Sequence, residues 1–366
     1  MIALYRKFFA RLPVRPVAGD EHLHLLSAEE VRFVRRRHRQ ALVISASLSV
    51  AGFLAYYLPV YSAPWLFPSV PLSLPWIGEF AFPWAETLWG VLLMVVEIYL
   101  LVLLNLWGVH EIAVATGLMG AHNKDQLAAQ MIGIGLEDKN RGLLEYGIDP
   151  FLGLNRGLLF TFNLVLRLKG WLGGKLLRYA VQRLLGRFAV REVLDFAGMP
   201  LYMIINAYST HVVLREARVI IMGQKLIEHL CHRLPASVGA DPAAQALLYD
   251  TFQFIAVSKR DFHHNHFLLT RALVEKYAIQ VKTAAALPDD YLERVRSAPD
   301  QLRQVCVLLL VLGFLLDGQV SWRERRRIGL LAEAGIIPYT VADVRAWGRS
   351  FVSGAGIEPL LARHLG

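Results

Sequence analysis

Two apolar stretches in the first third of the chain restrict its fold more than any other feature. The first runs from Gln40 to Ser62 and has no charged side chain, and the second runs from Leu88 to Val109 with Glu97 as its single charge. Each is long enough to cross a bilayer, which takes about 20 mainly apolar residues. The first begins too far along the chain for an ordinary signal peptide. The sequence therefore predicts a transmembrane helical hairpin over residues 40–109.

Composition favours a membrane over nucleic acid as the partner of this chain. Hydrophobic residues make up 55% of the 366 residues, and the net charge is +9. A positive charge attracts either nucleic acid or an anionic membrane surface. With so high an apolar content, we expect a bilayer containing anionic lipids as the partner, and no nucleic acid.

The positions of Lys and Arg predict which side of the membrane each segment occupies. Five arginines precede the first span: Arg32, Arg35, Arg36, Arg37 and Arg39. The connection from Ala63 to Thr87 has no Lys or Arg, whereas the chain after the second span is basic. We expect residues 1–39 to form a cytoplasmic basic helix in a protein of the cell (inner) membrane, with both termini cytoplasmic. Ser27 and Glu30 fit a capping box at the start of this helix.

Proline and tryptophan dominate the connection between the two spans. The prolines are Pro64, Pro68, Pro71, Pro75 and Pro83, and Trp65, Trp76 and Trp84 lie among them. Proline prevents long regular structure, and tryptophan favours the headgroup level of a bilayer. We expect a loop that lies flat on the outer leaflet, and a small hydrophobic docking surface is the alternative.

Glu97 is the residue within the spans that most needs an explanation, because a carboxyl group inside a bilayer is costly. Asn105 lies eight residues further on, on nearly the same side of a helix. One interpretation is an ion or proton pathway formed by several assembled hairpins. The other, which we favour, is a protonated Glu97 that is hydrogen-bonded to another helix and directs association. Both are compatible with a homo-oligomer or with another membrane protein as partner.

A basic amphipathic segment follows in the expected membrane-proximal domain, residues 110–296. Its cations recur at intervals of three to five on one side of a predicted helix: Lys175, Arg178, Arg183, Arg187 and Arg191. Such a helix can lie in the membrane interface with its basic side on anionic lipid. An ordinary core helix with a solvated charged side explains the pattern equally well.

The next stretch, Val193 to Leu214, approaches the length of a third span. Gly198 and Pro200 divide it, and Asn206 and His211 are polar. We find no fourth span to bring the chain back, so we expect a buried or re-entrant helical hairpin rather than a full crossing. Asn206 and His211 are then expected to be hydrogen-bonded core residues rather than ligands.

The C-terminal part offers two weak candidates for a metal ion, which would be the only cofactor. One is the group Asp261, His263 and His266, of which only the two histidines share a helix face. A helix start rich in polar caps explains it better. The two cysteines, Cys231 and Cys306, are far apart, which predicts reduced thiols rather than a disulfide framework or a Cys-rich metal site.

The second candidate lies next to a predicted core helix. The apolar run from Val305 to Leu316 is too short to span a bilayer and predicts a buried helix. Gly318 suits a helix stop in the left-handed conformation. Ser321 and Glu324 form a second capping box, which predicts a helix over 325–334.

These residues also resemble a known module. Asp317, Gly318, Val320, Ser321 and Glu324, after an apolar helix, are similar to the TerB-like domain of tellurite-resistance proteins. The resemblance covers about 60 residues and implies a helical domain over 297–366. It also implies a metal at Asp317 and Glu324, since acidic positions of that family are suspected of binding metal.

A wider resemblance covers the rest of the chain. The two spans, Asn206, the run from Leu214 to Arg218 and the run from Arg260 to His263 are similar to an uncharacterised family of bacterial two-span membrane proteins. The region from Gly198 to Asn206 faintly resembles EcsC-type domains. Neither resemblance implies an assigned activity.

Taken together, these patterns predict an all-α fold, with an N-terminal transmembrane hairpin and a helical cytoplasmic domain that has interfacial or re-entrant helices. No nucleophile elbow, zinc-protease motif, phosphate loop or redox cysteine pair is present, so we assign no catalytic residue and lean against an enzyme. The function we expect is a membrane-tethered interaction or lipid-contacting module. An oligomeric channel or transporter component using Glu97 is the first alternative, and a membrane-associated enzyme acting on lipid is the second.

Overall fold

The computed structural model describes residues 26–74, 78–117, 191–259, 263–280 and 287–365. The chain divides into two compact units. Of the described residues, unit 1 contains 33–112 and 191–215. Unit 2 contains 26–32 and 113–117, together with the described chain from Glu216 onward. The described chain is predominantly helical, with two long apolar helices near its N-terminus, so the predicted fold class is confirmed.

Helices α2 (Ala28–Ser62) and α3 (Trp84–Ala115) of unit 1 contain the two predicted spans. Both are long and apolar enough to cross a membrane. Only 17% of the most apolar segment of α2 and 6% of that of α3 are buried within the protein. A helix in the core of a water-soluble domain would be mostly buried, so these two present the surface that a bilayer covers.

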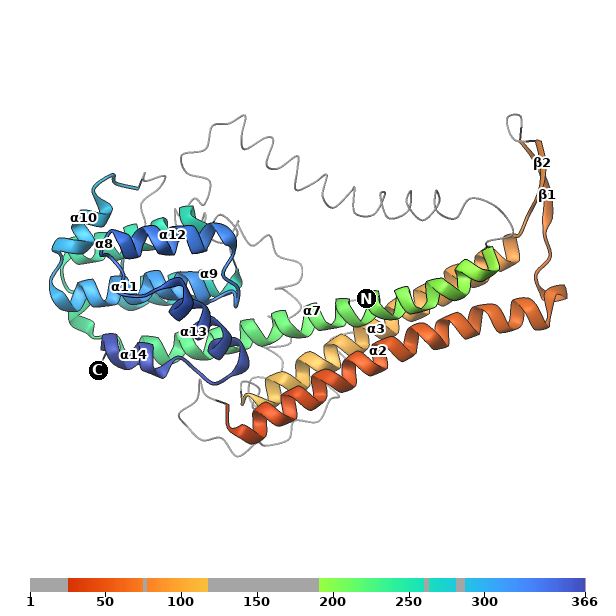
Figure 1. Ribbon diagram of the computed structural model, residues 1–366, viewed down its shortest axis with the longest axis horizontal. Coiled ribbons are helices and arrows are strands. Elements are labelled where there is room, and N and C mark those ends of the chain that lie inside the picture. Colours follow the sequence, from red (N-terminus) through yellow and green to blue (C-terminus); the bar gives the residue numbers. More distant parts are fainter. Residues whose placement is uncertain (1–25, 75–77, 118–190, 260–262, 281–286, 366) are drawn as a thin grey trace. The chain divides into compact units, whose positions relative to one another are not determined.

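Contacts at both ends of the pair show that α2 and α3 form an antiparallel hairpin (Figure 1). Next to the connecting loop, the Tyr56 hydroxyl donates a hydrogen bond of 2.6 Å to the Glu86 carboxylate. At the opposite end, the Arg37 guanidinium lies 2.8 Å from the Glu111 carboxylate. The hairpin predicted from the two apolar stretches is therefore present.

Helix α7 (Arg191–Arg233) corrects the prediction for the third apolar stretch. We expected Gly198 and Pro200 to divide this region into a buried or re-entrant helical hairpin, but α7 runs through both positions as one helix. Proline removes one backbone hydrogen bond, a loss that helices in apolar surroundings tolerate. The sequence prediction therefore gave Gly198 and Pro200 too much weight as helix-breaking residues.

Two hydrogen bonds fix the direction of α7 within unit 1. Asn206 bonds to Ser49, and Thr210 bonds to Ser45. Residue numbers thus rise along α7 while they fall along α2. Helix α7 is therefore antiparallel to α2 and parallel to α3, and its first part belongs to the same bundle.

The connection between α2 and α3 contains a short β-hairpin, which we did not predict. Strands β1 (Val70–Leu74) and β2 (Gly78–Phe82) pair antiparallel, with Val70 opposite Phe82 (Figure 1). A 3₁₀ turn, η1 (Pro64–Leu66), precedes them. The prediction excluded only long regular structure, and the two strands are short. Each strand of a two-stranded sheet has one free edge, and a proline such as Pro71 is tolerated there.

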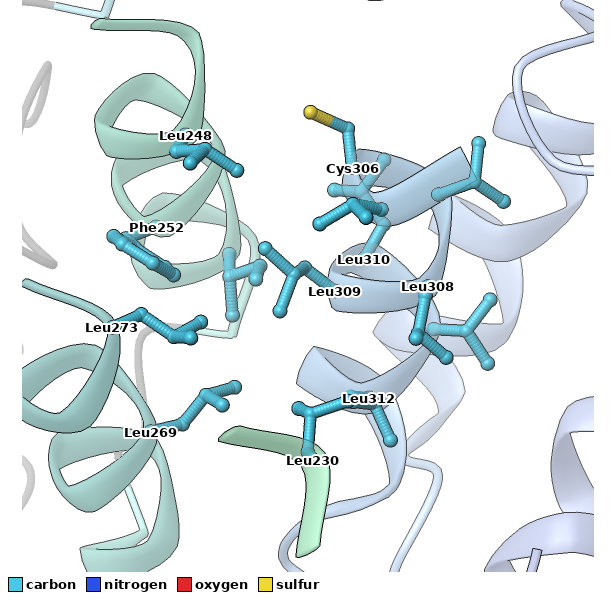
Figure 2. Close-up of a cluster of buried hydrophobic side chains, with 14 of the residues drawn as sticks. Leu230, Leu248, Phe252, Leu269, Leu273, Cys306, Leu308, Leu309, Leu310 and Leu312 are labelled. Atoms are coloured by element: carbon cyan, nitrogen blue, oxygen red, sulfur yellow. The ribbon is translucent and has the colours of Figure 1, made fainter. Parts of the chain in front are cut away.

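Unit 2 is a bundle of short helices around one central helix. Its elements after α7 are η2 (Ala236–Gly239), α8 (Pro242–Lys259), α9 (His264–Tyr277), α10 (Tyr291–Ser297), α11 (Asp300–Leu315), α12 (Trp322–Glu333), α13 (Val341–Ser353) and α14 (Glu358–Leu365). Helix α11 is buried from Val305 to its end, as predicted, and it packs against α8, α13 and α14. Figure 2 shows Leu309 facing side chains of α8 and α9, while Leu308 lies on the other side of α11.

The helices on either side of position 297, where we expected a domain boundary, share this core. Ile255 of α8 lies so close to Gly313 of α11 that a Cβ at residue 313 would be 2.8 Å from its side chain. Such close approach between helices requires glycine at the contact. Residues 216–366 accordingly form part of a single compact unit.

The predicted capping residues are present, although α12 spans Trp322–Glu333 where we predicted a helix over 325–334. Ser27 and Glu30 exchange the two hydrogen bonds of a capping box, at 2.7 and 3.2 Å. Ser321 and Glu324 do the same at the start of α12. Gly318, with a φ of 69°, follows α11 in the left-handed conformation. Each cap stabilises its helix by about 1 kcal/mol, so local sequence is enough to set these boundaries.

Candidate functional site

Glu97, the charged residue predicted inside the spans, contacts both neighbouring helices of unit 1. Its Oε1 accepts a hydrogen bond of 2.6 Å from Asn206 Nδ2 of α7. A Cβ at Gly52 of α2 would lie 3.4 Å from Glu97 Oε2, so the absence of a side chain at residue 52 leaves room for the carboxyl group. The bond to another helix that we favoured for Glu97 is therefore made to α7 of the same chain.

Hydroxyl groups of α2 extend this contact into a polar cluster. Asn206 Nδ2 also donates to Ser49 Oγ at 2.7 Å, and the Thr210 hydroxyl donates to Ser45 Oγ at 3.0 Å. We call Ser45, Ser49, Glu97, Asn206 and Thr210 the polar cluster. An amide NH₂ group has two donors, and Asn206 uses them to join a carboxyl group of α3 to a hydroxyl of α2.

Small residues let α7 approach α2 closely enough for these bonds. Ala41, Ser45 and Ser49 are buried and recur every four residues along α2. Small side chains at this spacing are typical of helix contacts inside membranes. The sequence contains this pattern, which is the signal that could have predicted a third helix in the bundle. We did not use it.

Asn105, predicted to share a helix side with Glu97, takes no part in the polar cluster. Its Oδ1 atom is buried and finds no hydrogen-bond partner in the described part of the chain. The spacing of eight residues places Asn105 more than two helical turns away from Glu97 along α3. Sharing one side of a helix therefore did not bring the two groups together.

A second group of polar side chains lies toward the start of α2. His38 Nε2 and His211 Nδ1 are 3.0 Å apart, which makes a histidine–histidine hydrogen bond between α2 and α7. The guanidinium of Arg37 lies over the Trp107 ring at 5.5 Å in addition to its pairing with Glu111. Arg37 was predicted only as an orientation signal. In the fold it also joins α2 to α3.

In unit 2, the two acidic residues considered for a metal lie on either side of a buried lysine. Lys259 Nζ is 2.8 Å from Asp317 Oδ2 and 2.5 Å from Glu324 Oε1. The side chains of Lys259 and Glu324 are 2% and 5% exposed. An ammonium group thus occupies the position between the carboxylates where a cation would bind. Removing one member of such a buried network leaves an uncompensated charge.

The histidines considered for a metal cap helix α9 and bond to other helices. His263 is the N-cap, and His266 Nδ1 accepts from the His263 backbone N–H. His266 Nε2 lies 2.8 Å from the Gly313 carbonyl, so both of its ring nitrogens are engaged. Full burial, followed by the nearby Lys259 charge, lowers the pKa of His266 well below its usual value. The predicted capping role is present, and a neutral His266 has no free nitrogen for a metal.

Asn265 joins three helices in the same region. Its Nδ2 donates to the carbonyls of Val219 in α7 and Leu316 after α11, at 2.9 and 2.8 Å. A Cβ at Gly223 would lie only 2.1 Å from that nitrogen. Glycine at 223 and asparagine at 265 therefore fit each other, and sequence reasoning identified neither.

The remaining predicted site residues fall partly outside the described chain. Lys175, Arg178, Arg183 and Arg187 lie there, as do the side chain of Arg191 and Asp261. Within the described residues, no group of three His, Cys, Asp or Glu side chains is placed to hold a metal ion. Cys231 and Cys306 are free thiols, and burial raises the pKa of Cys306 to about 11.

Comparison of the chain with models of protein families, with curated proteins and with solved structures gave no match.

Proposed function

We propose that this protein is a membrane-anchored interaction module, which holds a helical domain at the membrane surface without catalysing a reaction. The observation that carries the proposal is the contrast between the two units. The most apolar segments of α2 and α3 leave most of their surface uncovered, whereas the leucine-rich helix α11 is buried by its neighbours from Val305 to its end. A bilayer covers the first kind of surface, and water suits the second.

The direction of the helices supports placing the N-terminus and unit 2 on one side of the membrane. Helix α7 is parallel to α3, so it leaves unit 1 at the end where α2 begins. The arginines before α2 favour the cytoplasm at that end. We therefore propose the inner membrane as the location, with both termini cytoplasmic and the β-hairpin outside.

Labelling of single cysteines in whole cells, before and after the membrane is opened, tests this arrangement. A cysteine at exposed Trp65, in the connection between α2 and α3, should react with a membrane-impermeant maleimide added outside whole cells. A cysteine at exposed Glu29 should react only after the membrane is opened. Labelling of both positions from one side, or extraction of the protein from membranes by alkaline carbonate, would contradict the proposal.

The polar cluster favours a second candidate, a channel or transporter component that uses Glu97. It supplies an ionisable group with hydroxyl and amide neighbours between apolar helices, and such groups mark ion and proton pathways. Proteoliposomes with a pH-sensitive dye inside test it, with Glu97→Gln as the comparison. A proton leak that depends on Glu97 would support this candidate, and equal leak in both proteins would remove it. Sedimentation in detergent shows whether the chains form the ring that a multi-hairpin channel requires.

Lipid contact by the basic segment remains part of the main proposal. Lys175, Arg178, Arg183 and Arg187 recur on one side of the expected helix. Charge reversal of these four residues should weaken binding of the region after residue 110 to anionic liposomes. Unchanged binding would contradict lipid contact by this segment. The TerB-like character of residues 297–366 is likewise a proposal. Elemental analysis of the purified protein tests the metal that this resemblance implies.

A further inference from the structure

The outward face of helix α12 carries large apolar side chains that the unit 2 core does not use. Trp322 is 71% exposed and Leu330 is 50% exposed. They lie eight residues apart, which is about 80° around the helix axis, so both belong to its solvent-facing side. Among the described residues of unit 2, these two are the exposed large hydrophobic side chains. A bundle that buries its other large apolar groups and leaves two together on one helix presents a contact surface.

Arginines surround these two side chains. Arg323 and Arg326 are exposed, and Arg326 lies between Trp322 and Leu330 on the outward side. The neighbouring Arg325 and Arg327 are engaged elsewhere, because Arg325 Nε donates to the Val320 carbonyl and Arg327 lies over the Phe254 ring. We call Trp322, Arg323, Arg326 and Leu330 the α12 face. Glu324, on the same helix, points inward to Lys259, so its charge does not offset the arginines. The remaining acid of the helix, Glu333, is exposed on the same side at the end of α12, and it offsets part of the arginine charge.

The opposite side of α12 holds this face in a fixed orientation. Ile328 and Leu331 are fully or almost fully buried in the core. The Ser321 capping box fixes the first turn, and the Glu324–Lys259 pair ties that turn to α8. The α12 face is therefore part of a rigid element and does not have to be ordered when it binds, which lowers the cost of binding.

We propose that the α12 face docks on the headgroup region of an anionic bilayer. Arg323 and Arg326 complement anionic headgroups, and tryptophan and leucine suit the boundary between headgroups and acyl chains. The inference rests on the proposed membrane anchor, because α2 and α3 keep a bilayer permanently within reach of unit 2. An acidic protein could match the same charge, and the experiment separates the two partners.

The experiment uses the full-length chain in lipid nanodiscs with a fluorescent probe on α12. An environment-sensitive dye is attached to Gly329→Cys, where a Cβ meets no atom within 4 Å, in a Cys231→Ser background. Cys306 is buried and does not compete for the dye. Emission is recorded in discs of phosphatidylcholine and of phosphatidylcholine with phosphatidylglycerol, each with and without a lipid-linked quencher.

In discs with phosphatidylglycerol, the emission should shift to shorter wavelength and the lipid-linked quencher should reduce it. In phosphatidylcholine alone, the dye should stay in water. Changing Arg323 and Arg326 to Gln should lower the docking equilibrium constant about 25-fold, since each arginine near such a surface contributes about 1 kcal/mol. Trp322→Ala should weaken docking as well. The matched control, Arg345→Gln with Arg349→Gln on α13, should leave docking unchanged.

Three results would overturn the proposal: a dye that stays in water with phosphatidylglycerol, docking that is equal with and without it, or docking that needs an added acidic polypeptide. Failure of the anchor itself is seen separately, because the protein would then not remain in the disc during size-exclusion chromatography. A protein that stays in the disc with α12 in water keeps the anchor and removes only the docking.

Discussion

At the scale of single residues, the environment of Glu97 depends on one amide group. Asn206 gives both of its amide donors to unit 1, one to Glu97 and one to Ser49. A carboxyl group between apolar helices is costly unless it is hydrogen-bonded. The polar cluster therefore makes α7 a required partner of the hairpin rather than an optional one.

Replacing Asn206 with Leu should destabilise unit 1 by about 2 kcal/mol, because two interhelical bonds are lost and the carboxyl group stays behind. Heating in detergent, followed by size-exclusion chromatography, measures the effect as a lower Tm. Tyr208→Leu is the matched control, because Tyr208 is 68% exposed on the same helix. The double change of Glu97 and Asn206 to Leu should recover part of the loss. Equal Tm values for Asn206→Leu and Tyr208→Leu would show that the amide bonds contribute nothing.

His266 should make unit 2 less stable in mild acid. Its pKa is well below 6.5 in the fold, chiefly because of burial, whereas an unfolded histidine titrates near 6.5. The stabilising effect is thus complete above about pH 6.5 and is lost as the pH falls below that value. Between about pH 7.5 and 5.5, His266 should account for about 1.4 kcal/mol of lost unfolding free energy.

Urea midpoints at the two pH values, for the natural chain and for His266→Gln, measure this contribution. Burial also lowers the pKa of His364, so both proteins should lose stability in acid, and the difference between their slopes isolates His266. Identical slopes would mean that His266 is already charged in the folded protein.

At the scale of elements, helix direction sets the path of the chain through the membrane. Helices α3 and α7 run parallel in unit 1, so Ile112, the last residue of α3 in that unit, and Arg191, where α7 begins, belong to opposite ends of the unit. If α2 and α3 cross the bilayer, the beginning of α7 lies on the same side as the β-hairpin. The sequence prediction kept the chain after Val109 on the cytoplasmic side, so it placed no later segment on the side of the β-hairpin.

A cysteine at position 191 should therefore be labelled from the same side as a cysteine at Trp65, and from the opposite side to one at Glu29. The measurement is labelling of whole cells with an impermeant maleimide, before and after permeabilisation. Gln319→Cys in unit 2 is the control, and it should behave like Glu29→Cys. Protection of position 191 in whole cells would indicate that α7 does not traverse the bilayer beside α3.

The elements that sequence could predict are those determined by neighbouring residues. The two spans follow from the length of the apolar stretches, and α11 follows from an uninterrupted apolar run. The capping boxes predict where α2 and α12 begin. The polar cluster and the Lys259 pairs join positions far apart in the sequence, so no local pattern identifies the partners. The β-hairpin was not predicted because the proline content of the connection between α2 and α3 was given more weight than the alternating apolar residues in it.

At the scale of the whole molecule, the two units depend on different solvents. In the proposed arrangement, unit 1 relies on lipid or detergent around α2 and α3, while unit 2 is stabilised by burial of its leucine core away from water. Urea weakens the second kind of stabilisation. Helical structure enclosed in apolar solvent keeps its backbone hydrogen bonds, because no water competes for them.

Urea titration in detergent should consequently remove helical signal in one cooperative step and leave a plateau. Circular dichroism at 222 nm measures both quantities. Lys259→Met should lower the midpoint of the step, since losing the ammonium leaves two carboxylates uncompensated at a cost of about 3 kcal/mol. It should leave the plateau unchanged, and Asn206→Leu should leave the midpoint unchanged. A complete loss of helical signal in a single step would show that the two units unfold together.

The contact between Gly223 and Asn265 restricts how this chain can vary over evolution. Any side chain at 223 would collide with the Asn265 amide. At 265, aspartate lacks the donors for the two carbonyls, and glutamine carries them one methylene too far. Neither residue can change alone without loss of stability, so we expect Gly223 and Asn265 to be retained or replaced together in evolution.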